Sequence, residues 1–509
     1  MTRRSRQSPR DRARQTFEQL PYGPFRHRFP AFEVLREEAV EAIHDTSMDV
    51  LETAGLQVLD PESRRIFREG GFQVDNRAQR VRFDREGLME LVAKTPDRTS
   101  VRGRNPERRV QIGGDCMAVT AVGGPPFVSD LEHGRRAGNE ADMRGFIKLT
   151  HMLNVIDIEG GLSVEPTDLP AETRHLDFYL ACCELTDKPW KPLSAGRHKA
   201  EDAIAVAKIL FQEDEASLAA DPVFFVNTNT NTPLMMDADV AQGIIAFARI
   251  GQPICVTPFA LSGAMAPNTI AGALAVQNAE TLAACALVQL VRPGCPYVYG
   301  AFTSNVDMRT GSPAFGTPEY ALAAQASGQL ARRYDLPWRS SNTNASNAPD
   351  AQAAYEMQMA LWGALMGGTN MLLHGAGWLE GGLTASAEKF IMDVEMLQMF
   401  AELFKPLEVS AASLGVEAIA DVGHGGHFFG TQHTLDRYKT AFYAPLLSDW
   451  SNFENWRDSG AVDATQRASR IYKETLARYE PPAMDPARLE EIDAFIAKRT
   501  EEGGADIEK

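Results

Sequence analysis

The sequence predicts an α/β fold, a TIM (β/α)8 barrel with an N-terminal helical cap and a C-terminal helical extension. From Cys116 onward, short apolar runs alternate with turn residues and helical stretches. Eight such units over about 260 residues match the usual size of this barrel. A doubly wound open sheet is the main alternative, but no GxGxxG follows an early run. The eight predicted strands are residues 117–122, 155–158, 190–193, 223–226, 253–257, 297–300, 337–340 and 370–373.

The predicted helices support this count, because they are rich in Ala and contain no internal Pro. Before the barrel, residues 1–28 are expected to be a disordered basic tail and residues 29–114 a cap segment. The barrel is expected over residues 115–405, and residues 406–509 form an extension expected to pack on it. The helices expected between strands cover residues 199–212, 237–250, 270–291, 318–334 and 350–366.

The chain is organised around residues 369–395, TNMLLHGAGWLEGGLTASAEKFIMDVE. This stretch predicts a strand, a Gly-rich loop and a helix capped by Ser386. The loop carries His374, Trp378 and Glu380, and loops after buried strands are where α/β proteins bind ligands.

Composition limits the function classes. The chain has 509 residues, 44% hydrophobic content and a net charge of −17, which argues against nucleic acid as a partner. No apolar run reaches the roughly 18 residues of a membrane span, so no membrane partner is expected. Six cysteines without CxxC spacing argue against a zinc site or a disulfide framework, and a reducing cytoplasmic location is expected.

In a barrel, the functional side chains lie where the strands end. The predicted strand ends lack an Arg or Lys pair for phosphate, a metal-ligand cluster and a GxSxG motif, and no catalytic residue is assigned. Amides, aromatic rings and carboxylates remain, which suits a cationic ligand with a small polar group. The candidate substrate-binding residues are Glu159, Asn227, Asn229, Phe259, Phe302, Asn342, His374, Trp378 and Glu380.

Other interpretations of these residues stay open. Asn runs are common in turns, and His374 could be a hydrogen-bonded core histidine. Glu159 follows an apolar run, where an unpaired carboxylate is costly. His424, His427 and His433 are spaced like metal ligands but lack a close third ligand, so no metal is expected.

Several long stretches, in the same order, resemble the trimethylamine methyltransferase family. They are AVGGPPFVSD (121–130), SGAMAPNTIAGALAVQNAETLA (262–283), YGAFTSNVDMRTGSPAFGTPE (299–319), NAPDAQAAYE (347–356), GGLTASAEKFIMDVE (381–395) and GGHFFGTQHT (425–434). The resemblance implies a TIM barrel that moves a methyl group from a methylamine to the cobalt of a corrinoid carried by a separate protein.

Some members of this family carry pyrrolysine in the barrel, whereas this chain has only standard residues. The matching region is residues 340–347. Without pyrrolysine, the resemblance implies a quaternary amine such as a betaine as substrate, because a quaternary nitrogen already has the four bonds needed to leave as a neutral amine. We also expect a homo-oligomer.

Two other hypotheses stay open at this stage. The chain could be a barrel lyase or hydrolase on the same scaffold, or a protein that binds or senses a methylated amine without turnover.

Overall fold

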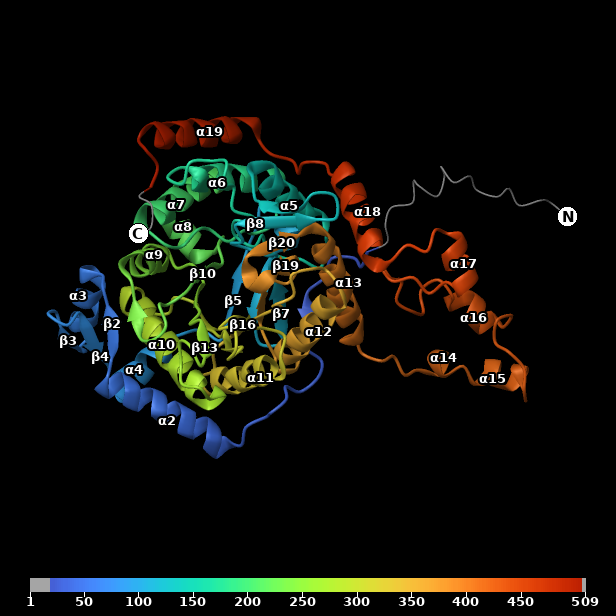
Figure 1. Ribbon diagram of the computed structural model, residues 1–509, viewed down its shortest axis with the longest axis horizontal. Coiled ribbons are helices and arrows are strands. Elements are labelled where there is room, and N and C mark those ends of the chain that lie inside the picture. The colour runs from blue at the N-terminus through green and yellow to red at the C-terminus, as the bar shows by residue number, and fades with distance from the viewer. Residues whose placement is uncertain (1–18, 506–509) are drawn as a thin grey trace.

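The computed structural model describes residues 19–505 and shows an α/β fold in which a curved, largely parallel sheet is surrounded by helices (Figure 1). Six neighbouring strands run parallel, and the sheet continues past β7 into antiparallel β6 (Val110–Gly113) and β5 (Arg98–Val101). A further strand, β1 (Phe25–Arg26), pairs antiparallel with β7. The six parallel strands are, in spatial order, β10 (Val226–Thr228), β12 (Ile254–Val256), β14 (Tyr297–Gly300), β17 (Trp338–Ser341), β18 (Met371–Leu373) and β7 (Cys116–Val119).

The prediction of eight regular strands is wrong at two positions. Residues 155–158 and 190–193 make isolated parallel bridges instead, which join Thr120 to Ile158, Glu159 to Trp190, and Trp190 to Phe224. Near residue 157, the Asp157 carboxylate accepts the Val119 amide (2.9 Å) in place of a backbone carbonyl. On either side of Trp190, Pro189 and Pro192 have no N–H to donate to a ladder.

Helices follow the strands on the outside of the sheet, as predicted (Figure 1). The five helices predicted between strands are confirmed to within two residues at each end. Their order along the chain is α5 (Glu140–Met152), α6 (Arg174–Leu185), α7 (Arg197–Phe211), α8 (Glu215–Ala220), α9 (Ala238–Arg249), α10 (Ile270–Val291), α11 (Pro318–Arg333), α12 (Ala351–Met366) and α13 (Ala387–Leu403).

Alternate residues of the strands point to the inside of the curved sheet, as the two-residue period of a strand requires. They form a separate apolar cluster, to which β5 and β6 add three side chains. Its members are Val101, Val110, Ile112, Ala118, Ile158, Phe225, Cys255, Val298, Met371 and Leu373. This cluster fills the amino-terminal half of the interior, so polar groups gather at the carboxyl ends.

Helix α10 is long and apolar enough, by length and composition, to cross a membrane. However, 83% of its most apolar window is buried inside the protein. Within it, Gln277, Asn278 and Glu280 are buried and bind neighbouring polar groups. The helix therefore has the surroundings of a core helix.

The N-terminal cap packs against α10 and the end of α11. Ser47 donates to the Ala275 carbonyl (3.0 Å), and His44 contacts the Tyr334 hydroxyl (2.8 Å). Residues 1–18 of the predicted tail lie outside the described residues, whereas Phe25 and Arg26 pair with β7. The cap consists of α2 (Glu37–Thr53), β2 (Leu56–Val58), α3 (Pro61–Glu69), β3 (Gln73–Asp75), β4 (Arg80–Arg82) and α4 (Arg85–Val92).

The C-terminal extension has two parts. Helices α18 (Ala464–Ala477) and α19 (Pro486–Glu501) pack on the barrel helices, and Arg499 pairs with Asp202 of α7 (2.7 Å). Residues 406–460, which we call the arm, extend sideways away from the body (Figure 1). The arm contains α14 (Ala411–Leu414), α15 (Val416–Val422), α16 (Gln432–Arg437) and α17 (Phe453–Asp458).

Candidate functional site

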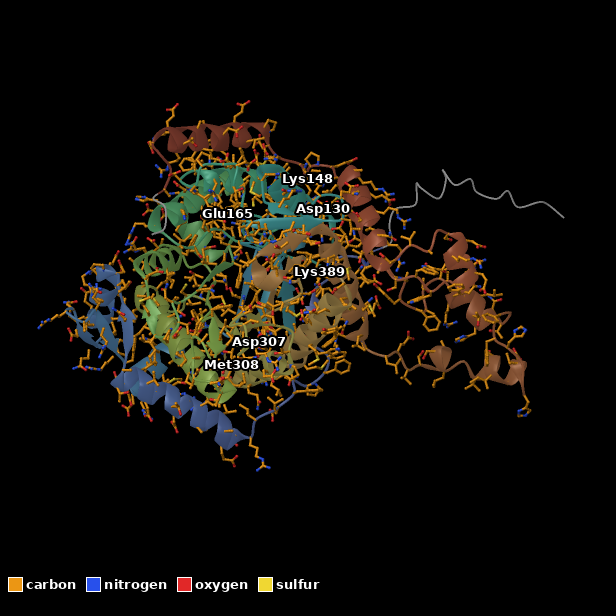
Figure 2. All side chains as sticks on the ribbon, viewed as in Figure 1. Asp130, Lys148, Glu165, Asp307, Met308 and Lys389 are labelled. Carbon is orange, nitrogen blue, oxygen red and sulfur yellow. The ribbon has the colours of Figure 1, made fainter. Side chains whose placement is uncertain are left out.

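The predicted site residues follow the carboxyl ends of the parallel strands, where loops fold into two small sheets. One contains β8 (Phe127–Asp130), β9 (Gly134–Ala137), β19 (Trp378–Leu379) and β20 (Thr384–Ser386). The other contains β13 (Ala260–Ser262), β15 (Thr303–Val306) and β16 (Pro313–Ala314), and its loop carries Asp307 and Met308 (Figure 2). We call this end of the sheet the mouth.

Four ionisable side chains interact at the mouth: Glu159, Lys191, Arg339 and His374. Burial is the largest influence on each. Beyond burial, Glu159 raises the pKa of Lys191, whereas Arg339 and Lys191 lower that of His374. The group therefore combines two cations with one carboxyl and a histidine whose pKa is well below its ordinary value.

Glu159 is fully buried and is held by its own loop. Its carboxyl group accepts the Gly161 amide (2.6 Å) and the Ser163 hydroxyl (2.5 Å). Burial raises its pKa from 4.5 to about 7, although these hydrogen bonds and the charge of Lys191 act in the opposite direction. Burial also disfavours the charged form of Lys191, and it lowers the pKa of this side chain from 10.5 to about 8.

Arg339 is a buried guanidinium on strand β17, with 2% of its surface exposed. Its Nη1 donates to the Ala301 carbonyl (2.9 Å), and its Cζ lies 5.2 Å from the centre of the Phe302 ring. Its Nε has no hydrogen-bond acceptor among the described residues, and no carboxylate there pairs with it. A buried guanidinium without an anionic partner is unfavourable unless a ligand supplies the anion.

Aromatic rings form a wall beside this guanidinium. The Trp378 ring lies 4.1 Å from that of His374 and 6.5 Å from that of Phe302, and Phe259 is 4.9 Å from Phe302. The buried Trp378 Nε1 also lacks an acceptor among the described residues. The structure therefore brings four of the predicted residues together: His374, Trp378, Phe302 and Phe259.

His374 has an uncommon backbone conformation, with φ of 55°. Non-glycine residues rarely adopt positive φ, and such strain is concentrated at functional sites. The ring Nδ1 lies 3.3 Å from the Ser341 hydroxyl. The ring is therefore held between β17 and the aromatic wall.

A buried polar network supports the loop that carries Trp378. Asp393 of α13 accepts the Gly377 amide (2.7 Å), pairs with Lys389, and accepts the Asn342 amide (3.2 Å). The Asn342 side chain also donates to the Gly375 carbonyl (3.0 Å). Asn342, predicted to bind substrate, is thus engaged in holding the loops after β17 and β18.

The remaining predicted residues lie at the edge of the mouth. Asn227 accepts the Thr257 hydroxyl (3.1 Å), whereas Asn229 is exposed in a loop anchored by Glu280. Glu380 forms a two-bond ion pair with Arg135 (2.7 and 3.0 Å), which lowers its pKa against the opposing effect of burial. These three are therefore not part of the buried group.

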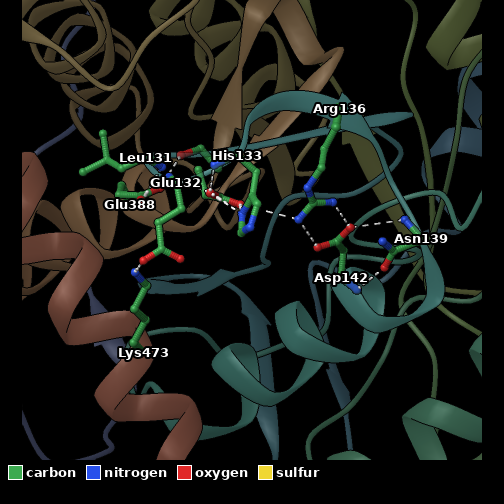
Figure 3. Close-up of polar contacts among 10 residues, drawn as sticks. Leu131, Glu132, His133, Arg136, Asn139, Asp142, Glu388 and Lys473 are labelled. Carbon is green, nitrogen blue, oxygen red and sulfur yellow. Dashed lines mark hydrogen bonds and ion pairs between the residues drawn. The ribbon is translucent and has the colours of Figure 1, made fainter.

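The β8–β9 hairpin that carries Arg135 is fixed to three helices (Figure 3). Arg136 pairs with Asp142, which forms a capping box with Asn139 at the start of α5. The Leu131 amide donates to Glu388 of α13 (3.1 Å), and Glu132 pairs with Lys473 of α18 (2.5 Å). The rim is therefore stiff on this side.

Within residues 19–505, no group of three His, Cys, Asp or Glu side chains is placed to hold a metal ion. His424, His427 and His433 lie in the arm, away from the mouth (Figure 1). His433 contacts the Ala412 carbonyl (3.0 Å) and so links α16 to α14.

Sequence reasoning missed Lys191 and Arg339. The sequence did carry a signal for Arg339, because this charged residue interrupts the apolar run that forms β17. Glu159 was predicted on a similar signal, a charged residue directly after an apolar run. Lys191 also lies inside a predicted strand, residues 190–193, but Pro192 already interrupts that short run, so the charge of Lys191 gave a weaker signal.

The sequence profile of the trimethylamine methyltransferase family matches residues 1–504 of this chain. The chain belongs to this family of methyltransferases.

Among curated proteins, it is similar to the glycine betaine methyltransferase of Desulfitobacterium hafniense strain Y51. The two are 36% identical over 476 residues, which cover 93% of this chain and 98% of the relative. It is also 29% identical to trimethylamine methyltransferases of Desulfitobacterium hafniense strain DCB-2 (92% of this chain, 93% of the relative) and Methanosarcina mazei (91% and 94%). Among solved structures, the monomethylamine methyltransferase of Methanosarcina barkeri aligns with a TM-score of 0.49 at 12% identity, over 88% of this chain and 95% of that one.

Proposed function

We propose that this protein transfers a methyl group from a betaine, a quaternary amine with a carboxylate, to the cobalt of a separate corrinoid protein. The observation that carries the proposal is the buried Arg339 guanidinium, which has no carboxylate partner in the described part of the chain and lies beside an aromatic wall. The similarity to a glycine betaine methyltransferase supports the same substrate class.

The two ends of a betaine match two parts of the site. A guanidinium binds a carboxylate through paired, charge-assisted hydrogen bonds, and the Arg339 Nε is a donor that has no acceptor within residues 19–505. The faces of Trp378, Phe302 and Phe259 attract the quaternary ammonium, which cannot donate a hydrogen bond. The aromatic residues are stronger candidates for the cation than Glu380, whose charge is already balanced by Arg135.

The chemistry requires no general acid or base in this chain. When the methyl group of a quaternary ammonium is transferred, a neutral tertiary amine leaves and no proton moves. The corrinoid supplies the cobalt that accepts the methyl group. The residues of this chain then act by orienting the substrate and excluding water from it.

The position of the site fits such a transfer. We infer that the isolated bridges at Ile158, Trp190 and Phe224 complete an eight-segment barrel between β7 and β10, with the candidate site at its carboxyl end. A corrinoid protein would then reach the substrate from that end.

The test is methylation of cob(I)alamin, followed by absorbance, with glycine betaine, longer betaines, tetramethylammonium and trimethylamine in parallel. We expect turnover with a betaine and none with trimethylamine. Equal turnover of trimethylamine would contradict the proposal. Tight betaine binding without methyl transfer, either to free cob(I)alamin or to candidate corrinoid proteins, would instead indicate a sensing protein.

A further inference from the structure

The arm has no hydrophobic core of its own. None of its helices α14, α15, α16 and α17 contains a buried residue. Twelve large apolar side chains of the arm are at least 45% exposed, and six of them are aromatic. They are Leu407, Val409, Leu414, Val416, Ile419, Phe428, Phe429, Leu435, Tyr438, Phe442, Trp450 and Phe453.

The exposed area is large enough for a stable interface. Phe429 is 84% exposed and Phe442 87% exposed. An aromatic side chain buries roughly 150–250 Å² when covered, so the twelve together expose on the order of 1,000 Å². A stable interface buries about 800 Å² on each partner. Monomeric proteins rarely leave so many large apolar side chains of one segment uncovered.

The arm nevertheless has a fixed attachment to the body. The Glu395 carboxylate of α13 accepts the Tyr443 hydroxyl (2.9 Å) and the amides of Leu446 (2.8 Å) and Leu447 (3.1 Å). At its other end, the arm follows Phe404, which packs on Phe25 (5.3 Å between ring centres). The arm is therefore attached to the body at its start and again at residues 443–447.

A second apolar surface lies on the body around the start of the arm. It consists of Phe29, Phe32, Trp362, Met399 and Leu403, each between 40% and 54% exposed. Ring contacts join this surface to the attachment point, because Phe29 packs on Phe404 (5.1 Å) and Trp362 on Phe400 (4.9 Å). The chain thus carries both an apolar arm and an apolar surface that its own arm leaves uncovered.

The charge of the arm and its position on the body limit which kind of partner can cover its apolar side chains. The arm contains seven Asp or Glu against three Lys or Arg, a net charge of −4, which disfavours an anionic membrane surface. Its attachment at Phe404 lies beside Phe25, which pairs with Met117 at the start of β7, so it is at the end of the sheet opposite the mouth.

We propose that the arm packs on the surface formed by Phe29, Phe32, Trp362, Met399 and Leu403 of a second copy of this chain. Because each copy carries both surfaces, a two-fold axis allows both arms to be exchanged in one closed dimer. This inference is independent of the substrate.

The test is sedimentation velocity of the full chain over a range of concentrations, with a double variant Phe429→Ser and Phe442→Ser in the arm. The wild type should sediment as a dimer or a multiple of one. The dissociation constant of the variant dimer should be at least about tenfold higher than that of the wild type. Trp362→Ser on the acceptor surface should have the same effect. Met308→Ser is the matched control, because Met308 is 66% exposed on a loop far from the arm (Figure 2).

Hydrogen exchange provides a second readout that does not depend on the variants. Amides of residues 406–442 should exchange more slowly as the wild-type concentration rises. A wild type that stays monomeric at all concentrations would overturn the proposal. The proposal would also be overturned if the arm variant and the Trp362 variant formed oligomers as stable as those of the Met308 control.

Discussion

Replacing Arg339 with Met separates the recognition of the carboxylate from that of the ammonium. Met fills a similar volume without charge, so the variant loses the guanidinium donors toward the substrate. Hydrogen bonds to a charged group contribute about 1.5–3 kcal/mol, which at about 1.4 kcal/mol per factor of ten raises the Kd for glycine betaine roughly 10- to 150-fold. The free protein should not be destabilised strongly, because the lost Ala301 contact is offset by removal of an unpaired buried charge.

Isothermal titration calorimetry with glycine betaine and with tetramethylammonium distinguishes the two ends of the ligand. The loss should appear for glycine betaine alone, since tetramethylammonium has no carboxylate. Arg64→Met is the matched control, because Arg64 is 8% exposed and donates to the carbonyls of Val58 and Leu59 in the cap. Unchanged glycine betaine binding, or an equal loss for both ligands, would refute the reasoning.

Three further predictions concern the same region. Trp378→Ala should weaken both ligands by about 0.5–2 kcal/mol in the same titration, because a cation–π contact does not depend on the carboxylate; a loss for glycine betaine alone would contradict this. The raised pKa of Glu159, about 7 against 4.5, means that the folded state binds more protons between these pH values, so its contribution to stability falls as pH rises from 4.5 to 7. At about 1.4 kcal/mol per pH unit this is at most about 3 kcal/mol, so in chemical unfolding Glu159→Gln should be less destabilising at pH 8 than at pH 5, and an equal effect at both pH values would exclude the shift. Lys389→Met leaves the buried Asp393 carboxylate unpaired and should lower the free energy of unfolding by about 3–5 kcal/mol, measured in denaturant, whereas Lys405→Met at an exposed pair should change it little.

The sequence predicted the order of the barrel units because apolar runs and helical stretches are local patterns. The helix α10, the strand β14 and the Ser386 cap of α13 were predicted to within one residue. The two irregular segments could not be predicted from apolar content. Their pairing depends on a side chain that replaces a backbone acceptor at Asp157 and on the prolines beside Trp190.

The candidate site was predicted less completely, because side-chain partners are not local. Asn342 follows a strand as predicted, yet it binds Asp393, which lies 51 positions further along the chain. Glu380 is similarly engaged by Arg135 from a distant hairpin. Arg339 was overlooked because charged residues are not expected inside a buried strand, and that exception is what makes it informative.

The balance of charge at the mouth gives a reason for substrate choice that is separate from leaving-group chemistry. At neutral pH, Arg339 and Lys191 are cations, Glu159 supplies at most one negative charge, and burial lowers the pKa of His374. A simple cation such as trimethylammonium would enter a site that already carries excess positive charge, and it would leave the guanidinium unpaired. A betaine brings its own carboxylate, so it satisfies Arg339 while its ammonium contacts the aromatic wall. The same pocket therefore disfavours simple methylamines by repulsion and favours zwitterions by pairing.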